Sequence, residues 1–190
     1  MEAEHRRARR ALGVVATAVV AVAGGIGLLL FFVARDDAPV GQSDRPTEIT
    51  GPGQAFPDLG ARHVSPAQRG RARYNSNPPT SGPHVAEAIR RDEIVLTTDQ
   101  VLHALELGNV VLEYGPDAPP PGLKALAEEV SGGPFEPALV SAGQSVILAR
   151  RPGTNGIVAL AWRHLRRAPA ADDPELRRFA EFWLGRGAER

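Results

Sequence analysis

The longest apolar stretch of the chain covers residues 11–34 and contains no charged side chain. Apart from its glycines, Thr17 is the one polar residue in it. As an α-helix this stretch would be about 36 Å long, enough to cross a hydrocarbon core of about 30 Å. The pattern therefore predicts a single transmembrane helix over residues 11–34.

Charges on either side of this stretch predict its orientation. Four arginines lie in the ten residues before it, against two glutamates. Because positively charged flanks stay on the cytoplasmic side, residues 1–10 are expected to be a cytoplasmic basic tail. Everything after residue 34 is then expected to be extracytoplasmic. The chain would be a single-pass protein of the cell membrane, and the lipid bilayer is its first expected partner.

Two other interpretations of residues 11–34 stay open. Ala21-Val22-Ala23 has the small residues of a signal-peptidase site. Cleavage there would leave a strongly apolar new N-terminus containing Phe31 and Phe32. A buried core helix is the other alternative, but such a helix normally has a polar face.

The hydrophobic pattern changes after the apolar stretch. Residues 35–60 have little apolar periodicity and contain Pro39, Gly41, Pro46, Gly51 and Pro52, which is typical of a partly extended linker. Residues 61–190 alternate between short apolar runs and amphipathic segments. They are expected to form one extracytoplasmic domain.

Short apolar runs within this domain predict strands at residues 110–114, 145–149 and 157–162, with a shorter β-rich run at 94–97. The glycine-rich turn over residues 151–156 suggests that the last two strands form a hairpin. The spacing of Leu123, Leu126, Ala127 and Val130 predicts an amphipathic helix.

A second helix has a clear start signal. Asp173 can cap it, Pro174 suits its first position and Glu175 suits its first turn. Strands and helices do not alternate regularly along the chain. The expected fold is therefore α+β: a small, mainly antiparallel sheet with two helices covering one face.

The most informative segment is residues 74–84, Tyr-Asn-Ser-Asn-Pro-Pro-Thr-Ser-Gly-Pro-His. Three prolines exclude a helix or a central strand, so the segment predicts a stiff, shaped loop. Stiff loops on a scaffold often carry function. The residues expected to shape the site or bind a ligand are Tyr74, Pro78, Pro79, Thr80, Ser81 and Gly82.

Three histidines and one carboxylate are the candidate metal ligands: His63, His84, His103 and Glu106. Imidazole and carboxylate groups suit a divalent transition metal when three or four converge. Their spacing matches no compact metal motif, so convergence depends on the fold. The alternative is that each histidine hydrogen-bonds nearby backbone and holds the loop closed. His164 lies in a basic segment and is expected on a solvated edge.

Composition limits the chemistry further. The chain has no cysteine, which excludes disulfides, thiolate zinc sites and thiol nucleophiles. The net charge is zero, so nothing points to nucleic acid.

Ser81 lies near His84 in sequence, as a serine nucleophile and its base would. No G-x-S-x-G elbow is present, so Ser81 is better explained as a turn residue than as the nucleophile of a hydrolase. Glu106 or Glu113 could act as a general base. Paired arginines are most simply solvated faces, with an anionic lipid or wall polymer as the alternative partner.

The segment 74–84, followed by His103-Ala-Leu-Glu106-Leu-Gly108, resembles the domain-of-unknown-function family numbered 3105. That family consists mostly of single-pass bacterial membrane proteins with an external domain. Its hallmarks fall here on His63, Tyr74, residues 78–84, residues 103–108 and Ala161-Trp162. Leu107 stands where the family usually has a second histidine, which would remove one ligand if the family's histidines bind metal.

Three functional hypotheses follow. The first is a membrane-anchored module that binds a metal ion or small ligand through His84 and His103. The second is a non-catalytic structural or interaction protein of the cell envelope, with the stiff loop as its contact surface. The third is a metal-dependent hydrolase. The sequence names no substrate.

Overall fold

The computed structural model describes residues 50–70 and 72–188. The transmembrane helix expected at residues 11–34, the basic tail and most of the linker lie outside this range. No helix within the range is long and apolar enough to cross a membrane. The described residues belong to one compact unit that begins at Thr50.

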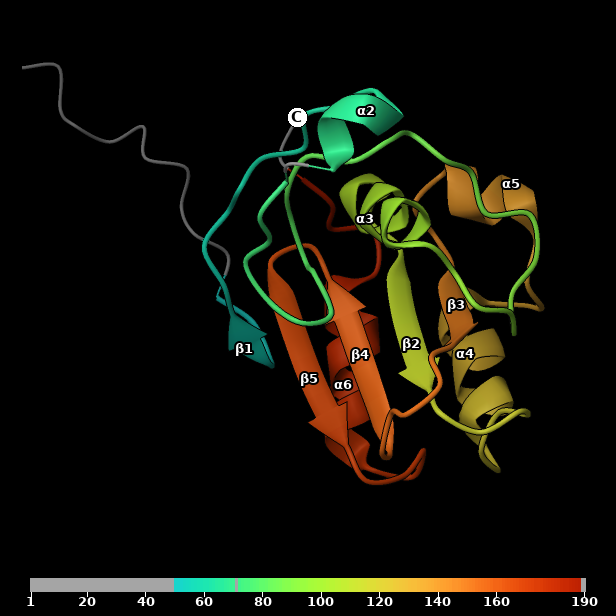
Figure 1. Ribbon diagram of the computed structural model, residues 1–190. Coiled ribbons are helices and arrows are strands. Elements are labelled where there is room, and N and C mark those ends of the chain that lie inside the picture. Colours follow the sequence, from blue (N-terminus) through green and yellow to red (C-terminus); the bar gives the residue numbers. More distant parts are fainter. Residues whose placement is uncertain (1–49, 71, 189–190) are drawn as a thin grey trace, which may run out of the picture. The chain divides into compact units, whose positions relative to one another are not determined.

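Five strands form one mixed sheet in the order β1-β5-β4-β2-β3 (Figure 1). The pairs β1–β5, β5–β4 and β4–β2 are antiparallel, and β2–β3 is parallel. The α+β class and the mainly antiparallel sheet expected from the sequence are therefore confirmed. The strands are β1 (Gln54–Ala55), β2 (Val110–Tyr114), β3 (Val146–Arg150), β4 (Ile157–Ala161) and β5 (His164–Ala168).

Helices cover both faces of the sheet, whereas the sequence analysis predicted two helices on one face only. Helices α4 and α6 pack on one face against Leu112, Leu148 and Ala159. Helices α3 and α5 and the segments around Phe56 and Ile89 pack on the other. The helices are α2 (Pro66–Arg69), α3 (Thr98–Leu107), α4 (Leu123–Ser131), α5 (Pro137–Ser141) and α6 (Pro174–Trp183).

The predicted hairpin between the last two apolar runs is wrong. Strand β2 lies between β3 and β4 and pairs with both. The turn over residues 151–156 passes the end of β2, where Arg151 N donates to Tyr114 O at 2.7 Å. Residues 94–97 form no strand either, since Ile94 makes only a single bridge to Ala149.

His164 also differs from its prediction. It lies in β5, is 5% exposed and stacks on Trp183 of α6 with ring centroids 3.8 Å apart. Its Nδ1 donates to Trp162 O at 2.9 Å. The basic residues beside it in the sequence suggested a solvent-exposed position. Side chains alternate between the two faces of a strand, however, and this one points towards α6.

The domain begins earlier than the predicted boundary at residue 61. Strand β1, within the expected linker, pairs with β5. Trp183 Nε1 donates to Pro52 O at 2.8 Å, and Gly51 lies against the rings of Phe182 and Trp183. A two-residue strand is too short to leave a hydrophobic pattern, which explains why residues 50–60 resemble a linker in the sequence.

Candidate metal centre

Helix α3 supplies two of the candidate ligands. Thr97 caps it by accepting from Gln100 N at 3.1 Å, and Gln100 Oε1 accepts from Thr97 N at 3.0 Å. His103 and Glu106 are three positions apart in the helix and therefore lie on one face. Gly108 ends the helix with φ of 107°, a left-handed conformation that favours glycine.

The stiff loop supplies the third ligand, His84, which is completely buried. His84 Nδ1 lies 2.9 Å from Gly82 O, to which it donates. Asp99, in the first turn of α3, accepts from Val85 N at 3.1 Å and pairs with Arg69 of α2 at 3.2 Å. This carboxylate therefore ties the residue after His84 to the helix that carries the other ligands.

His63 arrives from the segment before α2. Residues 60–64 and 82–84 run side by side as a short ribbon, in which His63 and His84 form a parallel bridge. Val64 N donates to His84 O at 2.9 Å, and His84 N donates to Arg62 O at 3.2 Å. These backbone bonds place two ligands that are distant in sequence beside each other.

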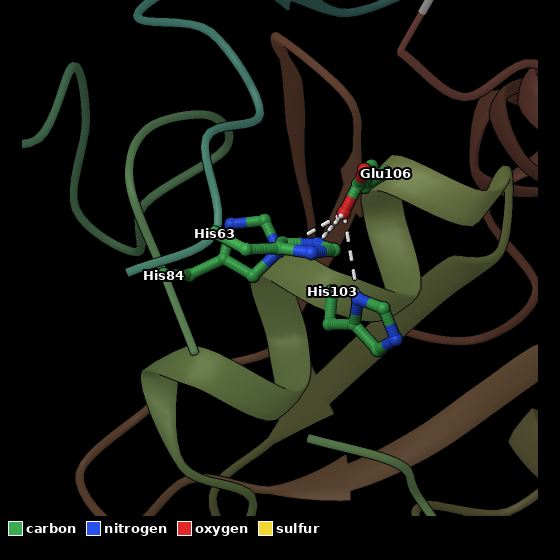
Figure 2. A group of neighbouring side chains, drawn as sticks. All are labelled: His63, His84, His103 and Glu106. Carbon is green, nitrogen blue, oxygen red and sulfur yellow. Dashed lines mark hydrogen bonds and ion pairs between the residues drawn. The ribbon is translucent and has the colours of Figure 1, made fainter. Parts of the chain in front are cut away.

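The three imidazoles converge on one carboxylate oxygen, Oε2 of Glu106 (Figure 2). It lies 2.8 Å from His63 Nε2, 3.1 Å from His84 Nε2 and 3.4 Å from His103 Nδ1. One ligand atom from each residue can be chosen so that all four lie within 4.8 Å of one another. The structure therefore brings together the four candidate ligands named from the sequence.

Exposure varies sharply across this group. The side chain of His84 is 0% exposed, His103 20%, Glu106 19% and His63 48%. The buried end is thus fixed by the stiff loop, and the His63 end faces solvent. An ion can enter from the His63 side.

Electrostatics favour the metal-binding forms of His103 and Glu106. Burial lowers the pKa of His103, and the nearby Glu106 carboxylate only partly offsets this. Burial alone would raise the pKa of Glu106, but the hydrogen bond from His63 and the imidazole charges outweigh it and lower the pKa. A neutral imidazole beside an ionised carboxylate is the state that binds a metal.

The expected site-shaping residues build the loop rather than join the four groups. The ring of Tyr74 lies against Gly82, and its hydroxyl donates to Pro83 O at 3.4 Å. Gly82 has φ of 133° and offers its carbonyl to His84. The others, Pro78, Pro79, Thr80 and Ser81, are buried or half-buried within the loop.

One loop residue that was not singled out from the sequence is the centre of its hydrogen bonds. The side-chain amide of Asn75 lies 3.0 Å from Thr80 Oγ1 and 2.8 Å from Ser81 Oγ. Its Oδ1 accepts from Thr80 N at 3.1 Å and Ser81 N at 3.3 Å. Asparagine commonly mimics a backbone turn in this way, so the asparagine-rich run was a usable signal.

Two further sequence candidates lie outside the group. Leu107 is not part of it, and four ligands converge without a side chain from that position. Glu113 is 4% exposed in β2 and pairs with Arg151 at 3.5 Å. Burial raises the Glu113 pKa to about 7, although the Arg151 charge opposes the shift.

Comparison with known proteins gives one match. A family model described as "Protein of unknown function (DUF3105)" matches residues 63–189, a range that begins at the first candidate ligand and contains all four. No curated protein and no solved structure matches the chain. Because the matched range covers well over half of the 190 residues, the chain belongs to the DUF3105 family.

Proposed function

We propose that this domain binds one divalent transition-metal ion through His63, His84, His103 and Glu106. The observation that carries the proposal is the hydrogen bonding of His84. In the neutral form that binds a metal, an imidazole has a single N–H, and in His84 this N–H would be on Nδ1, because the Gly82 carbonyl 2.9 Å away can only accept. His84 Nε2 therefore directs a lone pair at Glu106 Oε2, 3.1 Å away.

Two acceptors that face each other this closely need a proton or a metal ion between them. A proton shared by His84 and Glu106 would account for this one pair alone. A metal ion accepts both lone pairs and those of His63 and His103 as well. The geometry is therefore better explained by a shared metal ion than by three separate structural histidines.

Zinc is the ion that this donor set fits first. Zinc takes nitrogen and oxygen ligands in a tetrahedron, with bonds of about 2.0–2.1 Å that place ligand atoms about 3.4 Å apart. The four groups, within 4.8 Å of one another, reach that arrangement with small side-chain movements. Imidazole and carboxylate also suit copper and iron, so the experiment has to compare metals.

Metal content after purification tests the proposal. The full chain, purified without a histidine tag and incubated with zinc, copper or iron, is expected to retain about one ion per chain after desalting. Glu106→Gln should lower this content. Glu136→Gln is the matched control, because Glu136 lies at the exposed start of α5 and its side chain makes no capping bond. A wild-type chain that retains none of the metals contradicts the proposal and favours the structural or interaction role.

We further propose that the domain is held outside the cell membrane by residues 11–34. The support is the uncharged apolar stretch with arginines before it. A reporter enzyme that is active only outside the cytoplasm, fused after Arg190, should be active. A reporter that works only in the cytoplasm should be inactive in the same position, and the reverse pattern would reject this topology.

A further inference from the structure

A groove lies beside the candidate metal centre and is not part of it. It has a volume of about 620 Å³ and is lined by residues of α2, of the segments before and after α2, and of the stiff loop. We call it the arginine groove; its residues are Arg62, Ala67, Gln68, Ala72, Arg73 and Pro83. Arg62 and Arg73 are the only charged residues among those that line it.

These two arginines differ from the third arginine nearby. Arg69, in α2, is paired with Asp99 at 3.2 Å. Arg62 and Arg73 are both exposed, and within residues 50–70 and 72–188 neither side chain has an ion pair or hydrogen bond. Two like charges that line one groove repel each other, so an anion bound in the groove would offset this repulsion.

The groove faces away from the metal ligands. Arg62 and Pro83 directly precede His63 and His84 in the two paired segments of the ribbon. Successive side chains of extended backbone point to opposite sides. The groove therefore occupies the reverse face of the ribbon that carries two metal ligands, and a ligand there needs no metal.

The chemistry of the groove selects its ligand. Guanidinium groups are always charged, and their planar N–H donors match the oxygens of phosphate or carboxylate. Two guanidiniums are balanced by a dianion with several oxygens, which favours phosphate over a single carboxylate. Ala67, Ala72 and Pro83 add an apolar wall, and the volume exceeds that of phosphate alone.

We propose that the arginine groove binds the phosphate group of a small molecule, with Arg62 and Arg73 as the anion ligands. This site is independent of the metal proposal. The organic part of the phosphorylated molecule would lie against the two alanines and Pro83.

Calorimetric titration of the metal-free full chain at low salt tests the proposal. The protein is treated with a chelator, desalted, and titrated with inorganic phosphate and with glycerol 3-phosphate. Both probes should bind, and Arg62→Gln and Arg73→Gln should each weaken binding about tenfold, the effect of losing one charge-assisted contact. Equal affinities would identify free phosphate as sufficient, and tighter glycerol 3-phosphate binding would identify a phosphorylated organic ligand.

Arg91→Gln is the matched control. Arg91 is an exposed arginine outside the groove, and it too lacks an ion pair within the described residues. Its replacement should leave both affinities unchanged, and thermal melts should show that all three variants are folded. Absence of binding to the wild-type chain, or equal loss in all three variants, would overturn the proposal. Because no metal is present, neither result bears on the metal centre.

Discussion

Replacing His63 with alanine is expected to lower zinc affinity by more than about tenfold while leaving the metal-free protein as stable as the wild type. Partners that only orient a ligand contribute about 10- to 100-fold in metal affinity, so a ligand itself should contribute at least as much. His63 is 48% exposed, and exposed substitutions usually change stability by less than about 0.5 kcal/mol. Competition with a chromogenic zinc chelator measures the affinity, and urea unfolding measures the stability.

His84→Ala should have a larger effect on both quantities. Zinc binding should be lost, because His84 is the ligand whose orientation the loop fixes through Gly82. The ring is fully buried, so its removal leaves a cavity and should also cost about 2–4 kcal/mol of stability. The two variants together separate ligation from folding. Zinc affinity unchanged in His63→Ala would contradict a role for this residue as a ligand.

Glu113→Gln is expected to stabilise the protein at pH 8 and to have little effect at pH 4.5. Burial raises the pKa of this carboxyl from 4.5 to about 7 in the folded state. Between these values the folded protein keeps a proton that the unfolded chain releases, so stability falls as pH rises from 4.5 to 7. Above pH 7, ionisation of Glu113 lowers the free energy of unfolding of the wild type by about 3 kcal/mol. The neutral amide of the variant does not ionise, so the variant keeps this stability.

Urea unfolding of both proteins at pH 4.5, 6 and 8 checks this prediction. The difference between them cancels the titration of the histidines, which both chains share. Arg151 is 40% exposed, so in the variant it can be solvated without its carboxylate partner. A difference in stability that does not change with pH would show that Glu113 has an ordinary pKa.

The elements with complete local signals were predictable. Helix α6 begins with Asp173 as the cap, whose side chain accepts from Glu175 N at 2.9 Å, and Pro174 in the first turn. Strands β2 and β4 are buried at every position, which their apolar sequences indicate except at Glu113 of β2. Helix α4 ends at Gly132, in the left-handed conformation that its sequence suggests.

Helix α3 was missed although its start has a signal. Thr97 and Gln100 form a capping box, and Val101, Leu102 and Leu105 have the spacing of one helix face, so the signal for this helix is present in the sequence. Recognising the helix would have placed His103 and Glu106 on one face directly. The apolar side of α3 packs on the sheet, and the polar side carries the two ligands.

The strand order could not be predicted from the sequence, and the reason is different. Strands β3 and β4 are separated by only a short turn, which is equally compatible with a hairpin and with a passage around β2. The choice depends on which apolar surfaces meet, a long-range property. The ribbon that joins His63 to His84 has the same origin, because it rests on backbone bonds between segments about twenty residues apart.

X-ray absorption at the zinc edge of the zinc-loaded wild-type chain tests the central claim most directly. It reports the number and type of atoms bound to the ion. The proposed centre predicts about four nitrogen or oxygen neighbours at about 2.0–2.1 Å, with the multiple-scattering pattern of three imidazoles. That pattern should weaken in His63→Ala. A spectrum with six oxygen neighbours and no imidazole pattern would show zinc bound elsewhere on the surface, and it would contradict the metal centre.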